Sequence, residues 1–507
     1  MIREIFLVAA DTLHMPSVSW TGLLPVIILS AAAVLLLTIC SLIPKQITPR
    51  ILMGYTCSAA TASLIAAIPL WIRVQDKSDG PYTTLSGGFS IDGFSLFVTM
   101  LIAISVILIT CLAGTFLKLE SIEGPESYVL LLLSATGGII MAGANDFIIL
   151  FLGIEVLSIS AYVLAAMNLK RIQSQEAGLK YFVLGAFASG FLLYGIALLY
   201  GSTGSTGFTA IQNFLTDNEL KNDTLLLAGL ALVIIGFAFK VAAVPFHFWS
   251  PDVYQGAPTP FVAFMASVIK AAGFAAMLRV LYVTLGSYQA DWQPVIYAIA
   301  IATLLIGSLL AIVQTDLKRM LAYSSISHAG YLLVGTQAAS DQGVASVLFY
   351  LATYSFMVIG SFAVIALNSG PDGTQTSLES VAGLARQKPI LAVSFTIFLL
   401  GQAGVPLTSG FFAKFYVIEA AVETKSYGLA IVAMIAAVIG AFLYLRILIK
   451  IWLTNEDEED QKIETLKIPK QIILVIGTAT IFTVFLGIWP EPVIEMALRA
   501  IPILIAS

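Results

Sequence analysis

The stretch Phe239-Lys-Val-Ala-Ala-Val-Pro-Phe-His-Phe-Trp249 places a lysine and a proline in a long apolar run, and Gly401-Gln-Ala-Gly-Val-Pro-Leu-Thr-Ser-Gly-Phe-Phe-Ala-Lys414 does the same in a second run. Proline removes a backbone donor and clashes with the preceding turn, so Pro245 and Pro406, with Gly404 beside it, are expected to break their helices. Two broken helices in corresponding halves are typical of transporters with internal repeats. Two ordinary proline kinks are the alternative.

The composition of the whole chain points in the same direction. Of 507 residues, 59% are hydrophobic and 11% are charged, whereas a soluble domain has about 45–50% and about 25%. Lys and Arg number 25 against 30 Asp and Glu, so the basic surface of a nucleic-acid binder is missing. These values exclude a soluble enzyme and a disordered chain, and they indicate a polytopic membrane protein.

About fourteen segments have the roughly 20 apolar residues that a spanning helix needs. The sequence therefore predicts an all-α membrane protein with about 14 transmembrane helices. The predicted segments are Gly22–Ile43, Ile51–Ile72, Gly93–Phe116, Ser127–Ala144, Phe147–Met167, Leu179–Gly201, Thr224–Val244, Pro260–Leu285, Pro294–Gln314, Leu317–Gln337, Gly343–Leu367, Pro389–Ala421, Tyr427–Trp452 and Pro469–Trp489.

The distribution of basic residues predicts the orientation. Fourteen Lys and Arg residues lie in or beside loops that follow odd-numbered segments, against seven on the opposite side. The positive-inside rule then places the termini outside and the acidic loop Asn455–Glu464 inside. That loop is expected to be solvated, with a partner contact as the alternative. The Met1–Ala10 run is too short for a signal-peptide core, and no targeting segment precedes the first span. We therefore expect a bacterial inner membrane with periplasmic termini, and an organelle-encoded copy is the alternative.

Cofactor-binding patterns are not found in the sequence. Cys40, Cys57 and Cys111 lie in apolar runs without a C-x-x-C pair, and the three histidines are far apart. The stretch Gly201–Gly207 lacks the lysine of a phosphate-binding loop and is predicted to be flexible. The chain is thus expected to hold no cofactor or metal and to perform no redox, nucleotide or hydrolytic chemistry itself.

Ionisable residues inside the apolar segments are the sharpest signal. Glu155, Lys240, Lys270 and Lys414 are each flanked by apolar residues. Each such group costs about 2.5–3.5 kcal/mol at a helix centre, on the order of 10–14 kcal/mol for four before pairing. They are therefore expected to face a partly hydrated bundle interior.

Structural ion pairing accounts for one lysine with Glu155 but leaves two lysines unexplained. Burial disfavours the charged form of a lysine and a nearby carboxylate favours it, so a lysine between these influences can exchange a proton when its partner moves. These residues therefore suit a proton relay.

Two further residues are candidates for the same role. His328 lies mid-segment among hydroxyls in Tyr323-Ser-Ser-Ile-Ser-His-Ala-Gly-Tyr331, so it is either a proton shuttle or a satisfied core residue. Lys180 lies near a helix end and is either a relay member or an interface anchor. The two halves of the chain also share a weak sequence similarity. Asn145-Asp146 opens one predicted helix, and Thr315-Asp316 opens another.

Three motifs carry a resemblance to a known family: Leu179–Gly195, Val244–Pro260 and Gly404–Phe415. The chain resembles the antiporter-like membrane subunits of proton-translocating NADH–quinone oxidoreductase (respiratory complex I), and among them the subunit N group. The resemblance implies two inverted five-helix repeats, each with one broken helix. It divides the chain into residues 1–126 (three helices), 127–285 and 286–453 (the repeats), and 454–507 (the acidic loop and last helix).

The resemblance also implies roles for single residues. Glu155 resembles the carboxylate that tunes the seventh-helix lysine, Lys240. Lys270 resembles the connecting lysine, His328 falls at a polar connector, and Lys414 resembles the lysine on the exit side. Lys180 matches a sixth-helix lysine of many members. NADH, FMN, iron–sulfur clusters and quinone are expected in partner subunits, and the expected neighbours are another antiporter-like subunit and small membrane subunits.

Two other functions remain open at this point. A subunit of a monovalent cation/proton antiporter would use the same lysines and broken helices, although the motif detail over Asp252–Pro260 argues against it. A membrane scaffold with inert lysines is the third possibility. Within the first interpretation, outward release of a proton by this subunit and lateral relay of charge are both compatible with the sequence.

Overall fold

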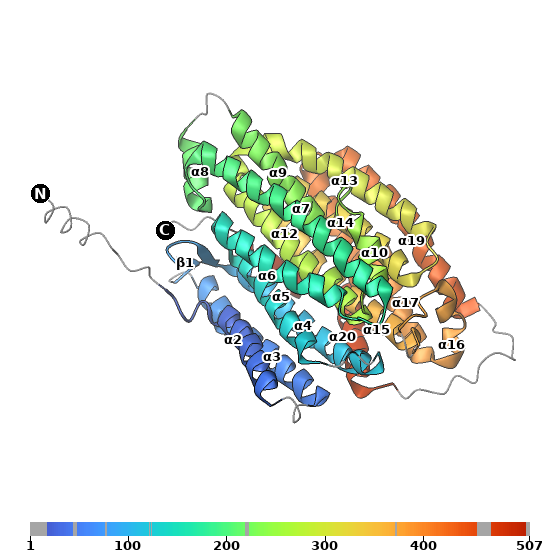
Figure 1. The fold of residues 1–507 in the computed structure, drawn as a ribbon. Coiled ribbons are helices and arrows are strands. Elements are labelled where there is room, and N and C mark those ends of the chain that lie inside the picture. The colour runs from blue at the N-terminus through green and yellow to red at the C-terminus, as the bar shows by residue number, and fades with distance from the viewer. Residues whose placement is uncertain are drawn as a thin grey trace, which may run out of the picture.

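The computed structural model describes residues 18–43, 48–76, 79–120, 122, 124–218, 223–370, 373–453 and 468–502. The predictions for Met1–Ala10, the acidic loop Asn455–Glu464 and the terminal residues lie outside the described residues. Figure 1 shows a bundle of long helices that run roughly side by side, with α2 and α3 along one edge and α13 and α19 along another.

The first half of the chain begins with a helical pair and continues through the first broken helix. Its elements are α2 (Leu24–Leu42), α3 (Pro49–Gln75), β1 (Tyr82–Thr84), β2 (Phe89–Ile91), α4 (Gly93–Leu119), α5 (Pro125–Gly143), α6 (Phe147–Ala165), α7 (Ile172–Thr203), α8 (Phe208–Asp217), α9 (Thr224–Lys240) and α10 (Trp249–Gly256). The two strands form an antiparallel hairpin in which Thr83 pairs with Ser90.

The second half opens with one long helix that contains two π-helical stretches. Its elements are α11 (Thr259–Phe264), η1 (Met265–Ile269), α12 (Lys270–Leu278), η2 (Arg279–Thr284), η3 (Gly286–Tyr288), α13 (Gln289–Ile312), α14 (Leu317–Ala338), α15 (Asp341–Asn368), η4 (Leu378–Val381), α16 (Leu384–Gln387), α17 (Pro389–Ala403), α18 (Ser409–Glu423), α19 (Tyr427–Leu453), α20 (Lys470–Ile488) and α21 (Glu491–Leu498).

The predicted all-α membrane fold is confirmed. Eleven helices of the described chain are long and apolar enough to cross a membrane. The other three predicted segments also fall on helices: α14 has 22 residues, while α9 and α17 are shorter because each ends at a break. The number of fourteen crossings stays a prediction.

Two local predictions were incomplete. The segment Gly201–Gly207 was expected to be a flexible loop, but α7 continues to Thr203 and ends at Gly204, whose φ of 74° suits glycine. The β1–β2 hairpin and the short helix α8 were not predicted, because strands of three residues and one helix of ten give no clear periodic signal.

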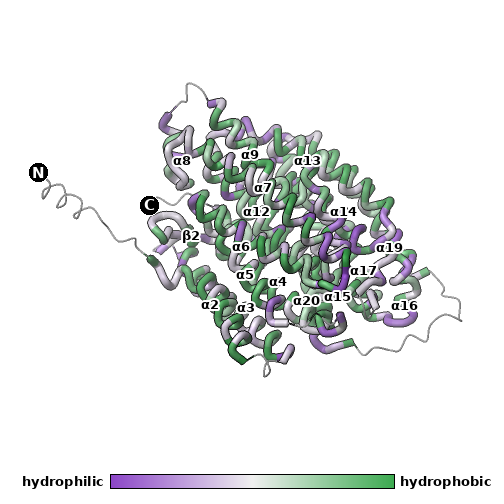
Figure 2. Tube along the Cα trace, viewed as in Figure 1, coloured by the Kyte–Doolittle hydropathy of each residue, from purple (hydrophilic) through white to green (hydrophobic). Residues whose placement is uncertain are grey.

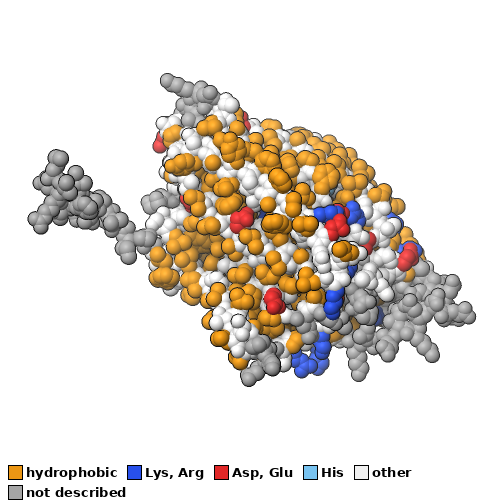
Figure 3. Space-filling view, in the orientation of Figure 1, with side chains coloured by type: hydrophobic (Ala, Val, Ile, Leu, Met, Phe, Trp, Pro, Cys, Tyr) orange, Lys and Arg blue, Asp and Glu red, His pale blue; other side chains and the backbone are white. Residues whose placement is uncertain are grey.

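Burial differs strongly among the long helices. The most apolar stretches of Thr259–Thr284 and α15 are completely buried, whereas those of α2, α7 and α19 are only one-third buried. The exposed faces carry large apolar side chains (Figure 3), as expected for lipid or partner contact. Figure 2 shows hydrophobic residues along most long helices and hydrophilic ones gathered near α10, α14 and α16. Lys270 on α12, His328 on α14 and Tyr350 on α15 lie in the protein interior.

Asp146 and Asp316, which open similar segments in the two halves, also make equivalent hydrogen bonds in the structure. Asp146 accepts from the Thr206 hydroxyl at 2.7 Å, and Asp316 accepts from the Thr376 hydroxyl, so that each threonine lies 60 residues after its aspartate. The backbone amide after each aspartate donates to the carbonyl of that same threonine, at 3.0 Å and 2.7 Å. The first junction lies at the β2 and α8 end of the bundle and the second at the α16 end (Figure 1). This placement supports the inverted repeat, which remains a prediction.

Candidate functional site

The first broken helix is present where the sequence predicts it. α9 ends at Lys240 and α10 begins at Trp249. The backbone groups freed between them find partners: the Val244 amide donates to the Thr303 hydroxyl at 3.0 Å, and the Trp249 indole donates to the Phe239 carbonyl at 3.0 Å. These two backbone groups are thus bonded within the protein, as is required at membrane depth.

Lys240 is buried at this break and donates a hydrogen bond to the Ser158 hydroxyl on α6. Glu155 lies one turn earlier on α6, where its carboxylate accepts from Ser189 on α7 at 2.6 Å. A cavity of about 10 Å³ is lined by Lys240, by Tyr162 and by Ser189, which is the partner of Glu155. This volume is about that of one water site. No ion pair involves Glu155 within the described part of the chain, so a purely structural Glu–Lys bridge does not account for Lys240.

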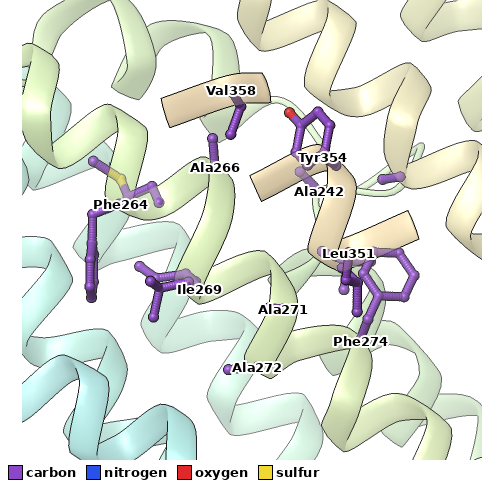
Figure 4. Close-up of a cluster of buried hydrophobic side chains, with 14 of the residues drawn as sticks. Ala242, Phe264, Ala266, Ile269, Ala271, Ala272, Phe274, Leu351, Tyr354 and Val358 are labelled. Atoms are coloured by element: carbon purple, nitrogen blue, oxygen red, sulfur yellow. The ribbon is translucent and has the colours of Figure 1, made fainter. Parts of the chain in front are cut away.

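Lys270 lies next along the interior. It follows the π-helical turn η1, a feature that often occurs at functional sites. Its ammonium donates to the carbonyl and, at 2.5 Å, to the hydroxyl of Ser325 on α14. It also lies 5.5 Å from the ring centre of Tyr354. Figure 4 shows the neighbouring apolar side chains of this helix and α15, including Ala271, Phe274 and Leu351. The buried ammonium thus has its hydrogen-bond partners on α14 and an aromatic ring on α15.

His328 continues the line one turn beyond Ser325. Its Nδ1 lies 2.7 Å from the Tyr350 hydroxyl and its Nε2 lies 3.1 Å from the Tyr444 hydroxyl. The Tyr444 hydroxyl also contacts the Ser324 hydroxyl at 2.6 Å. Both ring nitrogens therefore have partners that can donate or accept, which satisfies the buried imidazole and also connects it to its surroundings.

The second break holds Lys414. α17 ends at Ala403, and the Lys414 ammonium donates to the Ala403 carbonyl at 2.8 Å while it lies 4.8 Å from the ring centre of Tyr331. Gly404 has a φ of 88°, and a Cβ there would lie 2.8 Å from the Lys414 side chain. Only glycine therefore fits this turn without strain. A cavity of about 10 Å³ is lined by both His328 and Lys414.

Helix α12 connects Lys240 at the first break with Lys270. A Cβ built on Gly273 would lie 3.5 Å from the Lys240 side chain, and Gly273 is one turn from Lys270. The structure thus brings together five of the predicted residues in sequence along the interior: Glu155, Lys240, Lys270, His328 and Lys414. We call these five residues the polar line.

Lys180 is not part of the polar line. Its side chain is 42% exposed, and its ammonium lies 2.7 Å from carboxylate oxygens of both Glu176 and Asp252. Asp252 also binds Arg319 at 2.6 Å. Lys180, Glu176 and Asp252 line a polar cavity of about 370 Å³ that opens at the α10 side of the bundle.

Several residues of the interior were missed by the sequence reasoning. Ser158 lies three residues after Glu155 and therefore on the same helix face. It could have been predicted from this spacing. No sequence pattern indicates a role for Tyr350 or Tyr444, because their helices are apolar and only helix packing brings the two hydroxyls to His328. Lys318 was counted as a charge at a helix end, but it is fully buried and donates to the Ala257 carbonyl at 2.5 Å.

The arrangement can exchange protons between side chains. Amines, hydroxyls, an imidazole and a carboxylate follow one another through an otherwise apolar bundle. In the described residues there is no group of three or more His, Cys, Asp or Glu side chains that could hold a metal ion.

Comparisons with known proteins agree with this geometry. Residues 144–440 match the family "NADH:quinone oxidoreductase/Mrp antiporter, TM". Among curated relatives, NADH-quinone oxidoreductase subunit N of Chloroflexus aggregans is 38% identical and the alignment covers 97% of this chain and 99% of the relative. Subunit N 3 of Streptomyces griseus is 39% identical, with coverage of 96% and 94%.

Solved structures show the same fold. A chain of respiratory complex I from Thermus thermophilus with bound Aureothin has a TM-score of 0.76 at 29% identity and covers 94% of this chain and 99% of its own. A chain of the Mrp complex from Dietzia has a TM-score of 0.81 at 22% identity, covering 94% and 97%, and shares the fold. The chain therefore belongs to the NADH:quinone oxidoreductase/Mrp antiporter family, and within it to the subunit N group of NADH-quinone oxidoreductases.

Proposed function

We propose that this chain is the antiporter-like membrane subunit of a proton-translocating NADH–quinone oxidoreductase and that the polar line carries its protons. The observation that supports this function is the succession of hydrogen-bonded ionisable groups from the half-buried Glu155 to the buried Lys414. Such groups are costly in a membrane interior and are retained for ion or proton pathways. The chain itself supplies proton transfer, and electron transfer from NADH to quinone takes place in partner subunits.

The proposed route begins at the first break. A proton taken up from the inside near Pro245 reaches Lys240, whose partner Ser158 provides a hydroxyl that can both donate and accept. It then passes to Lys270, one turn from the Gly273 contact with Lys240. Ser325 and His328 lead it on to the cavity shared with Lys414, from which it leaves outward.

Glu155 has a different role in this proposal. Its carboxylate is half-buried at the α6–α7 surface and is bonded to Ser189 rather than to Lys240. A charge change in a neighbouring subunit on this face alters how strongly Glu155 favours the protonated form of Lys240. Glu155 thus couples events outside the chain to the first lysine of the polar line.

The proposed location is a bacterial inner membrane with the α10 and α16 end inside. Arg171, Lys180 and Arg319 lie at that end, in agreement with the positive-inside rule. The large apolar side chains exposed on α6 and α7 fit a neighbouring antiporter-like subunit and small membrane subunits. FMN, the iron–sulfur clusters and the NADH and quinone sites are assigned to other subunits.

The first experiment is to solubilise native membranes in a mild detergent and stain a native gel for NADH dehydrogenase activity. Co-migration of this chain with a large NADH-oxidising assembly is the expected result. Migration only with small membrane proteins, together with Na⁺-driven proton exchange in vesicles without NADH, would instead support a cation/proton antiporter.

The second experiment tests the polar line through Lys240→Ala. Because this change removes the donor to Ser158 and the exchangeable proton, we expect NADH-driven acidification of inverted vesicles to fall by about tenfold or more. Lys170→Ala, which removes an exposed lysine, is the matched control. Normal assembly with unchanged pumping in Lys240→Ala would refute the role of Lys240.

A further inference from the structure

Two of the three cysteines lie together, although nothing in the proton path uses them. The Sγ atom of Cys57 on α3 is 3.9 Å from that of Cys111 on α4. Cys111 is buried and Cys57 is half-buried, and the Cys57 sulfur also lies 3.9 Å from the Ile107 carbonyl, one turn before Cys111. The thiol pair thus bridges the two helices directly.

The two helices are packed against each other at this point. A Cβ built on Gly114, one turn beyond Cys111, would lie 2.7 Å from the sulfur of Met53, one turn before Cys57. The glycine therefore leaves room for the Met53 side chain between the two helices. A disulfide has sulfur atoms about 2.0 Å apart, so the two sulfur atoms, which are 3.9 Å apart, have to move toward each other for the bond to form.

The depth of the pair decides which oxidant can reach it. Cys57 lies eight residues after the start of α3 and Cys111 eight residues before the end of α4. At about 1.5 Å per residue, both are about 12 Å inside the same end of the bundle. Water-soluble thiols and oxidants are excluded at this depth, whereas an apolar oxidant in the bilayer can reach the half-buried Cys57 on α3. Helices α2 and α3 form one edge of the bundle (Figure 1).

We propose that Cys57 and Cys111 form a redox-active dithiol that a lipid-soluble quinone oxidises to a disulfide tying α3 to α4. Two thiols lose two electrons and two protons, the sulfur–sulfur bond forms, and the quinone takes up both electrons and both protons to become the quinol. The disulfide holds α3, and α2 which packs on it, against α4, and α4 in turn contacts α5, α11 and α15. This inference is independent of the proton route, because it concerns none of the residues of the polar line.

The test counts free thiols. Membranes are treated with a short-chain quinone, denatured in the presence of a maleimide of defined mass, and the labelled chain is resolved by gel shift. The untreated chain is expected to take three labels and the oxidised chain one, on Cys40, which lies apart in α2. Reduction of the oxidised sample with dithiothreitol after denaturation should restore three labels.

Single variants make the result specific to the pair. Cys57→Ser and Cys111→Ser should each take two labels with or without quinone, and Cys40→Ser should fall from two labels to none. Three labels on the quinone-treated native chain, or loss of two labels in Cys57→Ser, would overturn the proposal. Because NADH oxidation and pumping are not measured, failure of the proposed function does not affect this outcome.

Discussion

The two broken helices hold their lysines in different ways. Lys240 ends α9, before its break, and donates to a side-chain hydroxyl on a neighbouring helix. Lys414 lies after its break and donates to the carbonyl of Ala403, a backbone group that the break itself leaves free. The first lysine therefore depends on a second helix that can move or change charge, whereas the second is held by its own broken helix.

Helices α6 and α14, which open with Asp146 and Asp316, also differ at equivalent positions. Counted from the capping aspartate of each helix, Glu155 stands at the position of Ser325, and Ser158 stands at the position of His328. One half thus places a carboxylate where the other has a neutral hydroxyl. Similar scaffolds therefore carry a charge-sensitive half and a half built mainly from hydroxyls and an imidazole.

The largest effect is expected when Lys414 loses its exchangeable proton. Lys414→Ala removes the donor to Ala403, and Lys414→Arg keeps a positive charge that does not deprotonate. Because both remove proton exchange, NADH-driven pumping in vesicles should fall in both by about tenfold or more. If Lys414→Arg pumps normally, the lysine is only a structural cation and the two halves do not share a mechanism.

A smaller effect is expected from Tyr444→Phe, which removes one hydroxyl between Ser324 and His328. The loss of one buried hydrogen bond of about 1 kcal/mol corresponds to about a fivefold slower transfer. Pumping is measured in parallel for Tyr331→Phe, which removes a hydroxyl that donates to the Ala433 carbonyl and has no other hydrogen bond among the described residues. Equal rates in the two variants would remove Tyr444 from the proton route.

The equivalence of the two halves is tested by Asp146→Ala and Asp316→Ala. Each change removes a helix cap and a hydrogen bond to a threonine. We expect each to lower stability by about 1–2 kcal/mol, since an N-cap side chain contributes about that amount. Thermal inactivation of the purified assembly provides the measurement. A marked effect of only one substitution would show that the two junctions are not equivalent.

The smallest effect is expected from Lys180→Ala. Its ion pairs with Glu176 and Asp252 are partly exposed, and such pairs contribute below about 1 kcal/mol. Assembly on native gels and pumping should both stay close to normal. A loss of pumping as large as that of Lys240→Ala would place Lys180 on the proton route despite its position at the open polar cavity.

Much of this protein could be predicted from its sequence because the bilayer leaves few choices. Apolar runs of spanning length must form helices, and ionisable residues inside them must face the interior, so the fold class and the candidates Glu155, Lys240, Lys270 and Lys414 follow from pattern alone. The breaks at Pro245 and Pro406 follow from the geometry of proline. The orientation and the number of crossings remain predictions.

The partners of the charged groups could not be predicted in this way. Ser158, Ser325, Tyr350 and Tyr444 acquire meaning only through helix packing, which brings α6 to α9, α12 to α14, and α15 and α19 to His328. Packing also takes Lys318 from a helix end into the core and leaves Lys180 at the surface. Local pattern and the energy of burial select which residues must be inside, but the distances across helices depend on contacts between residues far apart in the chain.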